Sequence, residues 1–353
     1  LNMLTDKAAA ECLIQEACPR GPYVDPVLAG SPSLYADFLH GLWSRNMVVF
    51  KPLDKSVKPI GVFCVAKKSG MQRLIFDTST ANCYLASPPS TRLPSASAFA
   101  DLEVSGGKCL VAAGDIENAF YRMKLPTGME DFFRLPAIDG DYLAARGVTG
   151  VESGPVQACI LVMPMGFAWA LHLCQCALLS AISDAGIPGA RLIEDGRPGV
   201  QPDSDDVVAC AGYVDNYLTL GTSGKRVDAA LDEVSAALTR AGLVVHSPDY
   251  ASGDCSFLGM ELPAGRWLSI KGRNVWRLRF AIESLLRRRC VSGDLLRVVI
   301  GHVTWASLVR REALSLLNAC YAFIAEAGAS VCEMWPSVRK ELWNVRCPLP
   351  LLT

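Results

Sequence analysis

Cys109-Leu-Val-Ala-Ala-Gly-Asp115 carries the strongest structural signal in the chain. Its small and apolar residues predict a buried strand that ends in an aspartate. A second apolar segment, Val207–Leu220, has Asp215-Asn216 at its centre and predicts a hairpin with Asp215 at the tip. A carboxylate at the end of a buried strand is costly unless it is paired or binds a cation. Taken alone, either aspartate is better explained as a turn cap, but two on adjacent strands could hold divalent metal ions.

The segments around these aspartates give a definite order of elements. Gly166–Ala181 predicts a buried helix, and Phe257–Leu262 predicts a short strand. A further helix shows its apolar face at Val227, Leu231, Val234 and Leu238. Gly242 closes that helix after its last turn. The order strand, helix, hairpin, helix, strand is that of a split βαβ sheet, which places the chain in the α+β class.

The flanking segments predict strands upstream and helices downstream. Ser33–Val48 has helical spacing, and Ile60–Val65 and Arg73–Phe76 predict two strands joined by a turn. Three downstream helices are expected around Val275–Leu285, Leu295–Val309 and Leu314–Ala325. Ile193–Asp206, rich in Asp, Pro and Gly, predicts a solvated surface insert.

Composition indicates a packed globular chain. Hydrophobic residues make up 51% of the 353 residues, and the formal net charge is -1. The run Ser153–Ser183 contains no Asp, Glu, Lys or Arg and is long enough for a membrane span. Pro164 and Gly166 interrupt it, so a buried strand–turn–helix is the preferred interpretation. No signal peptide opens the chain, and an intracellular location without a transmembrane segment is expected.

Five short motifs follow one another along the chain. They are Lys67-Lys68-Ser-Gly-Met-Gln-Arg73-Leu-Ile-Phe-Asp77, Gly114-Asp115-Ile-Glu-Asn-Ala-Phe120, Met163-Pro-Met-Gly-Phe167, Tyr213-Val-Asp-Asn216 and Phe257-Leu-Gly259. In this order they resemble the fingers hairpin, first catalytic motif, Leu-Pro-x-Gly motif, Tyr-x-Asp-Asp box and primer grip of reverse transcriptases. The resemblance is greatest to gypsy-like and tyrosine-recombinase retroelements. Each motif alone is weak, whereas the ordered set is specific.

The resemblance covers about residues 34 to 330 and implies a right-hand polymerase. Fingers are expected over 34–107, a split βαβ (ferredoxin-like) palm over 108–264 and a helical thumb over 265–332. Part of the fingers would return at 125–160, with a surface insert near 186–206. Residues 1–33 would form an N-terminal extension, and 333–353 a C-terminal linker that is truncated.

The implied reaction is RNA-directed DNA synthesis, in which deoxynucleotides are added to a primer 3′-hydroxyl along an RNA or DNA template. Asp115 and Asp215 would bind Mg²⁺, or Mn²⁺, with help from the backbone carbonyl of Ile116. Asn216 would complete the catalytic set. The two metals would stabilise the attacking and leaving oxygens of the phosphoryl transfer.

The same resemblance implies a pocket for the deoxynucleoside triphosphate. Its lining would comprise Lys67, Lys68, Arg73, Phe120, Met165 and Gly166. The basic residues would pair with the triphosphate, since Arg offers a planar fork and Lys a point charge. The ring of Phe120 would exclude a ribose 2′-hydroxyl. The simpler alternatives are a solvated basic strand and a core phenylalanine.

Nucleic-acid contacts are expected from Tyr213 and from the primer-grip residues Phe257, Leu258 and Gly259. Downstream, residues 265–311 contain eleven Lys and Arg but only two acidic residues. Arg287, Arg288 and Arg289 would bind the phosphate backbone of the template–primer. Basic residues also favour a helix C-terminus through the helix dipole, which explains them equally well.

Two departures from the family, at Asn216 and in the stretch 244–255, support a second hypothesis. Asn216 stands where most relatives have aspartate, so one negative charge is missing. Glu117 could compensate, although a solvent-facing side chain is the better explanation. The stretch 244–255 has no lysine to protonate the leaving pyrophosphate, and His246 is its only candidate acid. The alternative is a decayed palm that binds nucleic acid without polymerising.

Overall fold

The computed structural model describes Leu4 and residues 7–18, 20–67, 70–102, 109–202, Ser204, 206–251, 255–262, 268–347 and Leu349. It is a mixed α/β structure that divides into two compact units. Unit 1 comprises Leu1–Thr91, Ile116–Leu178 and Gly242–Val244, and unit 2 comprises Arg92–Asp115, Leu179–Ala241 and Val245–Thr353. The bounds of fingers, palm and thumb stay predictions.

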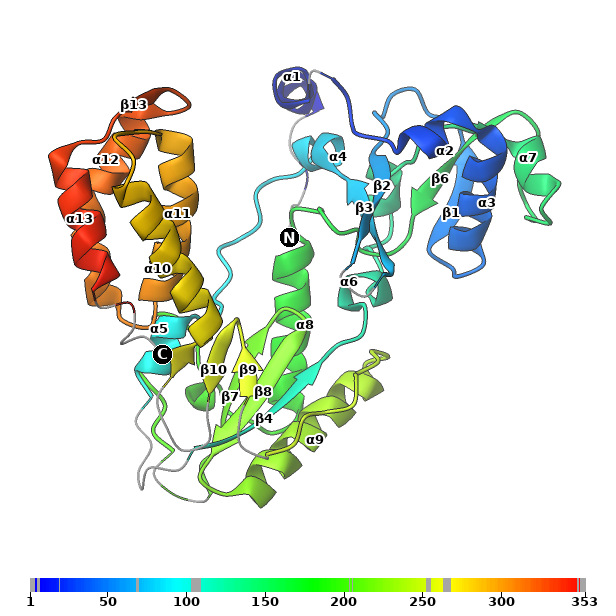
Figure 1. Ribbon diagram of the computed structural model, residues 1–353. Coiled ribbons are helices and arrows are strands. Elements are labelled where there is room, and N and C mark those ends of the chain that lie inside the picture. Colours follow the sequence, from blue (N-terminus) through cyan, green and yellow to red (C-terminus); the bar gives the residue numbers. More distant parts are fainter. Residues whose placement is uncertain are drawn as a thin grey trace. The chain divides into compact units, whose positions relative to one another are not determined.

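Unit 1 contains two small antiparallel sheets and short helices. Its strands are β1 (Val48–Pro52), β2 (Gly61–Ala66), β3 (Gln72–Asp77), β5 (Ile138–Asp139) and β6 (Pro155–Ile160). Its helices are α1 (Lys7–Ala17), α2 (Pro26–Gly30), α3 (Pro32–Trp43), α4 (Ser79–Cys83), α6 (Ala119–Arg122), the 3-10 turn η2 (Met129–Phe132) and α7 (Gly140–Ala144). One sheet has the order β1-β6-β5, and the other is the expected β2–β3 hairpin, paired from Gly61 with Asp77 to Ala66 with Gln72. Helix α3 packs on β1 (Figure 1).

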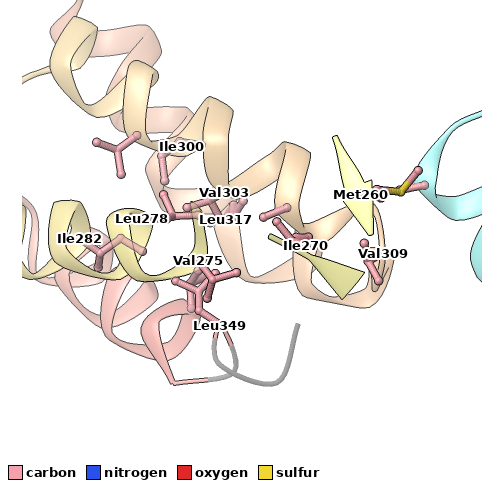
Figure 2. Close-up of a cluster of buried hydrophobic side chains, with 14 of the residues drawn as sticks. Met260, Ile270, Val275, Leu278, Ile282, Ile300, Val303, Val309, Leu317 and Leu349 are labelled. Carbon is pink, nitrogen blue, oxygen red and sulfur yellow. The ribbon is translucent and has the colours of Figure 1, made fainter. Parts of the chain in front are cut away.

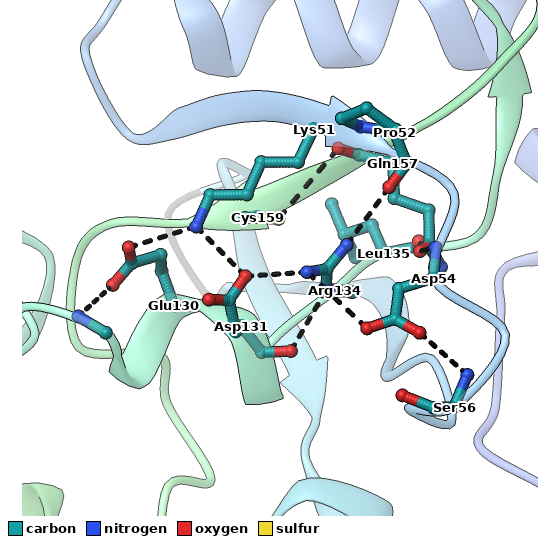
Figure 3. Close-up of polar contacts among 11 residues, drawn as sticks. Lys51, Pro52, Asp54, Ser56, Glu130, Asp131, Arg134, Leu135, Gln157 and Cys159 are labelled. Carbon is teal, nitrogen blue, oxygen red and sulfur yellow. Dashed lines mark hydrogen bonds and ion pairs between the residues drawn. The ribbon is translucent and has the colours of Figure 1, made fainter.

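A polar network braces unit 1 around Arg134, whose side chain is only 8% exposed (Figure 3). Arg134 donates to Asp131 Oδ1 at 2.6 Å and to the Pro52 carbonyl at 3.1 Å. Lys51 Nζ contacts the same Asp131 carboxylate at 2.9 Å and Glu130 at 3.2 Å. A buried guanidinium needs such partners to offset its lost hydration. Lys51 is therefore neutralised within the fold by these two carboxylates.

Unit 2 is built on the antiparallel sheet β4-β8-β7 (Figure 1). Its strands are β4 (Leu110–Asp115), β7 (Ala209–Tyr213) and β8 (Asn216–Gly221), and helix α9 (Gly224–Arg240) packs on β4 and β8. After α9 the chain returns along the free edge of β4, where Ala113 and Asp249 exchange two backbone hydrogen bonds of 2.9 Å. With α8 (Ala170–Asp184) between β4 and β7, the expected split βαβ order is present.

One expected strand is wrong in detail. The split βαβ unit is closed by the segment that contains Asp249, not by Phe257–Leu262. The latter region folds into a hairpin, β9 (Cys255–Phe257) and β10 (Met260–Leu262), which pairs with β11 (Ser269–Ile270) in a separate sheet. Leu258 and Gly259 form the turn with φ values of +51° and +80°. Positive φ at both central positions is typical of tight hairpins, but leucine at the first position gives no sequence signal for it.

The C-terminal part of unit 2 is helical. It contains α10 (Gly272–Leu286), α11 (Gly293–Ser307), α12 (Asn318–Ala327) and α13 (Pro336–Arg346), with the 3-10 turn η4 (Arg311–Leu317) and the strand pair β12 (Cys290–Ser292) and β13 (Val331–Glu333). Their shared core includes Val275, Leu278, Ile282, Ile300 and Val303 (Figure 2). The apolar periodicity of the sequence accounts for this core, since residues three and four apart share one helix face.

Two segments outside the expected helices and strands contribute side chains to the core. The segment 193–206 follows the 3-10 turn η3 (Gly189–Arg191), and its Ile193 and Val200 lie in the unit 2 core. The short helix α5 (Ala96–Ala100) contributes to the same core. In the expected linker 333–353, α13 buries Val338, Leu342 and Val345. Its Glu341 also accepts hydrogen bonds of 2.8 Å from the backbone of Ala319 and Cys320, at the start of α12.

The uncharged run Ser153–Ser183 is divided between strand β6 and helix α8, with a turn between them. The strand–turn–helix interpretation is therefore confirmed. Gly166 in the turn has φ +106°. Within the described residues, no helix combines the length and the apolar character that a membrane span requires.

Candidate active site

The tip of the β7–β8 hairpin positions Asp215. Tyr213 and Asn216 are paired across the two strands, so Val214 and Asp215 alone form the loop. Val214 is buried and has φ +59°, which is unfavourable for a β-branched residue. Such backbone strain persists only where the surrounding structure imposes it, and it is concentrated at functional sites.

Asp115 lies opposite this tip. It ends β4, and its cross-strand partner in the β4–β8 ladder is Asn216. The preceding pair is Gly114 with Tyr217, and a Cβ on Gly114 would overlap the buried Tyr217 ring. Tyr217 is itself fixed by a 2.7 Å hydrogen bond to Ser235 on α9. Glycine at 114 thus allows the two strands to bring Asp115 beside the Asp215–Asn216 tip.

The electrostatics of Asp115 fit a cation site. Burial and the nearby Asp215 carboxylate raise the pKa of Asp115, while His246 acts in the opposite direction. His246 Nε2 lies 3.6 Å from Asp115 Oδ2, and the His246 backbone N–H donates to the Asp115 carbonyl at 2.9 Å. Two carboxylates that disfavour each other's charge gain most from a divalent ion between them.

Asn216 contacts Asp215 directly. Its Nδ2 donates a 2.8 Å hydrogen bond to Asp215 Oδ1, which orients that carboxylate. The amide thereby supplies a donor where an aspartate would add a second negative charge. Asn216 therefore serves as a positioning group in this arrangement.

The donor set suits Mg²⁺ that is shared with a substrate. Among the described residues no group of three or more His, Cys, Asp and Glu side chains could hold a metal ion. Asp115 and Asp215 are hard oxygen donors, and both are half-buried. Mg²⁺ is commonly bound by one or two carboxylates together with substrate phosphates, so two carboxylates are sufficient. The contribution of the Ile116 carbonyl stays a prediction.

Glu117 does not join the carboxylate pair. Its Oε2 accepts from Arg122 at 2.7 Å, and its backbone N–H donates to Val244. The hypothesis that Glu117 compensates for Asn216 therefore finds no support in its contacts.

The candidate nucleotide-pocket residues lie in unit 1. Arg73 is on β3, paired with Val65, and Lys67 stands exposed at the end of β2. Lys68 lies outside the described residues. Tyr121, beside Phe120 in α6, donates a 2.7 Å hydrogen bond to the Leu74 carbonyl. The motif that follows Asp115 is thus attached to the strand that carries Arg73.

The structure shows the surroundings of Phe120 and Gly166, which the sequence did not determine. Phe120 is only partly buried, so it is not one of the core phenylalanines. Gly166 would place an added Cβ 2.9 Å from the Phe76 carbonyl oxygen and 3.0 Å from Thr78 Oγ1. Its own carbonyl accepts from Asn82 Nδ2 at 2.9 Å. Asn82, which the sequence did not indicate, therefore holds the Met165–Gly166 turn.

The primer-grip candidates lie at the end of β9 and in the β9–β10 turn. Phe257 is buried in the unit 2 core, and Leu258 packs against that core. An added Cβ on Gly259 would lie 2.8 Å from the Trp305 ring on α11, so the glycine is required by its contact as well as by its φ. Tyr213, at the end of β7, also packs against this core. Trp305 is a contact that sequence spacing did not reveal.

Arg287, Arg288 and Arg289 follow directly after α10 and are exposed. Arg289 is paired with Glu333 at 3.2 Å, and the Arg288 carbonyl accepts from Arg339. Both explanations of the arginine run, phosphate binding and helix C-terminal stabilisation, are compatible with these positions.

The architecture is similar to that of solved reverse transcriptases. The foamy viral protease-reverse transcriptase in complex with double-stranded DNA matches 95% of this chain with a TM-score of 0.63 and 14% identity. The same kind of viral protein in complex with an RNA/DNA hybrid matches 94% with a TM-score of 0.58 and 14% identity. No protein-family model and no curated protein matches the sequence. The chain has a reverse-transcriptase-like fold.

The match covers only part of the viral proteins. This chain spans 50% of the length of the first structure and 38% of the second. At this identity the likeness concerns the fold. The gypsy-like or tyrosine-recombinase type stays a prediction.

Proposed function

We propose that this chain is the polymerase region of an RNA-directed DNA polymerase. One observation carries the proposal. In a reverse-transcriptase-like fold, β4 ends in Asp115 opposite the Asp215–Asn216 tip of the neighbouring hairpin, and the pKa of Asp115 is raised partly by Asp215. An enzyme that transfers a nucleotidyl group needs such a pair of carboxylates for its metal ions.

The reaction joins a primer to a deoxynucleoside triphosphate. The primer 3′-hydroxyl gives up its proton to solvent, and its oxygen forms a bond to the α-phosphorus while the bond from that phosphorus to the bridging oxygen breaks and pyrophosphate leaves. Bound Mg²⁺, or Mn²⁺, would supply electrostatic stabilisation of the attacking and leaving oxygens. Asp115 and Asp215 would hold the ions, and Asn216 would keep Asp215 oriented through its 2.8 Å hydrogen bond.

The remaining candidate residues have supporting roles in the proposal. Arg73 and Lys67 would bind the triphosphate, with Lys68 beside them, because phosphate oxygens favour charge-assisted hydrogen bonds. Phe120 would restrict the sugar pocket. Met165 and Gly166 would approach the nucleotide closely, since Gly166 adopts a backbone conformation that an L side chain would strain.

The direct experiment is primer extension on RNA and DNA templates with Mg²⁺ and with Mn²⁺. Wild-type chain is expected to extend the primer, whereas Asp115→Asn and Asp215→Asn should not. Asp249→Asn is the matched control, because Asp249 contacts β4 through its backbone. Extension that persists in both site variants would contradict the proposal.

The second candidate is a decayed palm that binds template and primer without polymerising. Asn216 is the observation that favours it, because an amide attracts a divalent ion far less than a carboxylate does. Inert wild-type protein together with an active Asn216→Asp variant would support this alternative.

A further inference from the structure

Helices α10 and α13 pack side by side (Figure 1). Charged and aromatic side chains of the two helices contact one another in a continuous row. Glu283 Oε1 accepts from Arg279 at 3.3 Å and from Arg346 at 2.8 Å. The Arg279 guanidinium lies 5.3 Å from the Trp276 ring centre, and that of Arg346 lies 4.9 Å from the Trp343 ring centre. We call Trp276, Arg279, Glu283, Arg346 and Trp343 the arginine–tryptophan ladder.

Both tryptophans of the ladder remain open to solvent. Trp276 is 52% exposed and Trp343 is 56% exposed, and Phe280, one turn from Trp276, is 65% exposed. Large apolar side chains grouped on one surface usually mark a binding site. The core of α10 is formed by Val275, Leu278 and other residues on its opposite face, so packing does not require these rings.

The charge around the ladder is positive. One carboxylate, Glu283, serves two guanidiniums, so the ladder has a surplus cation. Residues 272–289 contain six arginines and this single acidic residue. The Glu283 carboxylate also fixes the two guanidiniums, which reduces the entropy lost when a ligand binds them. The occupant is expected to be an anion that also offers flat apolar faces.

We infer that the arginine–tryptophan ladder binds single-stranded nucleic acid. Bases of a single strand can stack on exposed indole rings, whereas bases in a duplex already stack on each other. Arginines supply phosphate contacts beside the rings. The inference extends the proposed function, since a polymerase that copies a template also handles its unpaired part, but the contact itself needs neither catalysis nor metal.

The experiment is fluorescence anisotropy of a labelled single-stranded oligothymidylate, without metal and without nucleotides. A Trp276→Ala/Trp343→Ala double variant should bind at least about tenfold more weakly, because base–aromatic stacking contributes about 1–3 kcal/mol per base. Trp276→Phe/Trp343→Phe should retain most of the affinity, since phenylalanine keeps a stacking face. Tyr142→Ala, which removes an exposed ring from α7, is the matched control and should bind normally.

The result does not depend on polymerase activity. If primer extension fails while the alanine variant still loses oligothymidylate binding, the proposed function fails and the inference stands. If the alanine variant fails to fold, Trp276→Leu/Trp343→Leu, which keeps apolar area without a ring, supplies the comparison. Unchanged oligothymidylate affinity in a folded alanine or leucine variant would overturn the inference. A changed sedimentation coefficient with unchanged affinity would also overturn it and identify a contact between copies of the chain.

Discussion

Asn216 donates a hydrogen bond of 2.8 Å from Nδ2 to Oδ1 of Asp215, its neighbour at the hairpin tip. An ionised carboxylate at position 216 could not donate this hydrogen bond. Because residue 216 is an amide, Asp215 and Asn216 together carry one acidic group beside the half-buried Asp115.

Asn216→Asp should therefore make the protein more dependent on divalent ions. In chelator, the loss of the hydrogen bond and the added repulsion should lower the free energy of unfolding by about 1 kcal/mol. Mg²⁺ should restore stability, because ligands that bind only the folded chain stabilise it. Thermal unfolding with and without Mg²⁺ measures both effects. Equal midpoints for both proteins in chelator would show that the contact is unimportant.

The rate of primer extension tests the same substitution differently. If the site is active with asparagine at position 216, Asn216→Asp should change the rate of primer extension only a few-fold, which corresponds to about 1 kcal/mol or less of barrier.

Phe120→Ala should admit ribonucleotides while preserving much of the deoxynucleotide incorporation. The partly buried ring follows Asp115 by five residues and is not part of the core. Single-nucleotide incorporation with each sugar gives the ratio of kcat/KM values. An unchanged ratio would remove Phe120 from the sugar pocket.

Gly114→Ala should destabilise the fold by about 1–3 kcal/mol, because its Cβ would overlap the Tyr217 ring. Gly301→Ala is the matched control in α11, where nothing lies within 4 Å of the added Cβ. The control should stabilise its helix by about 0.5–1 kcal/mol. Urea unfolding of both variants decides the point. A neutral Gly114→Ala would mean that β4 and β8 do not approach so closely.

Asp77 should make the stability of the chain depend on pH. Burial alone would raise its pKa, but hydrogen bonds from Ser79 and from the Tyr23 backbone hold the pKa below its ordinary value. The stabilisation is therefore present above the ordinary carboxyl pKa and is lost as pH falls through the lowered value.

Asp77→Asn should consequently cost about 1 kcal/mol at neutral pH, a modest figure because the side chain is partly exposed. The difference from wild type should shrink once the pH falls below about 4. Urea unfolding over this range provides the measurement, and a constant difference at every pH would exclude a role for the carboxylate charge.

Local pattern was sufficient to predict much of the fold. The strands around Asp115 and Asp215, the β2–β3 hairpin and the apolar face of α9 follow from periodicity and turn chemistry. The pairing of Asp115 with Asn216 then follows from the split βαβ order.

Features set by distant contacts could not be predicted in this way. Leu258 adopts positive φ although leucine does not favour it, so the tight β9–β10 turn carried no signal in the sequence. Val214 adopts the same unfavourable backbone conformation at the tip of the β7–β8 hairpin. Lys51 is neutralised by Glu130 and Asp131, which are far away in the sequence. Helix α13 is rich in charge, and only its contacts with α10 and α12 show that it belongs to the core.

The most direct test of the central claim is incorporation of one nucleotide opposite a defined template base. The wild-type chain should add only the complementary deoxynucleotide, in a reaction that requires Mg²⁺ or Mn²⁺. Asp115→Asn and Asp215→Asn should each slow it by about a thousandfold, or about 4 kcal/mol of barrier, while Asp249→Asn remains near the wild-type rate. Addition that ignores the template, or that survives in both site variants, would contradict the assignment of Asp115 and Asp215 as the metal-binding pair of a template-directed polymerase.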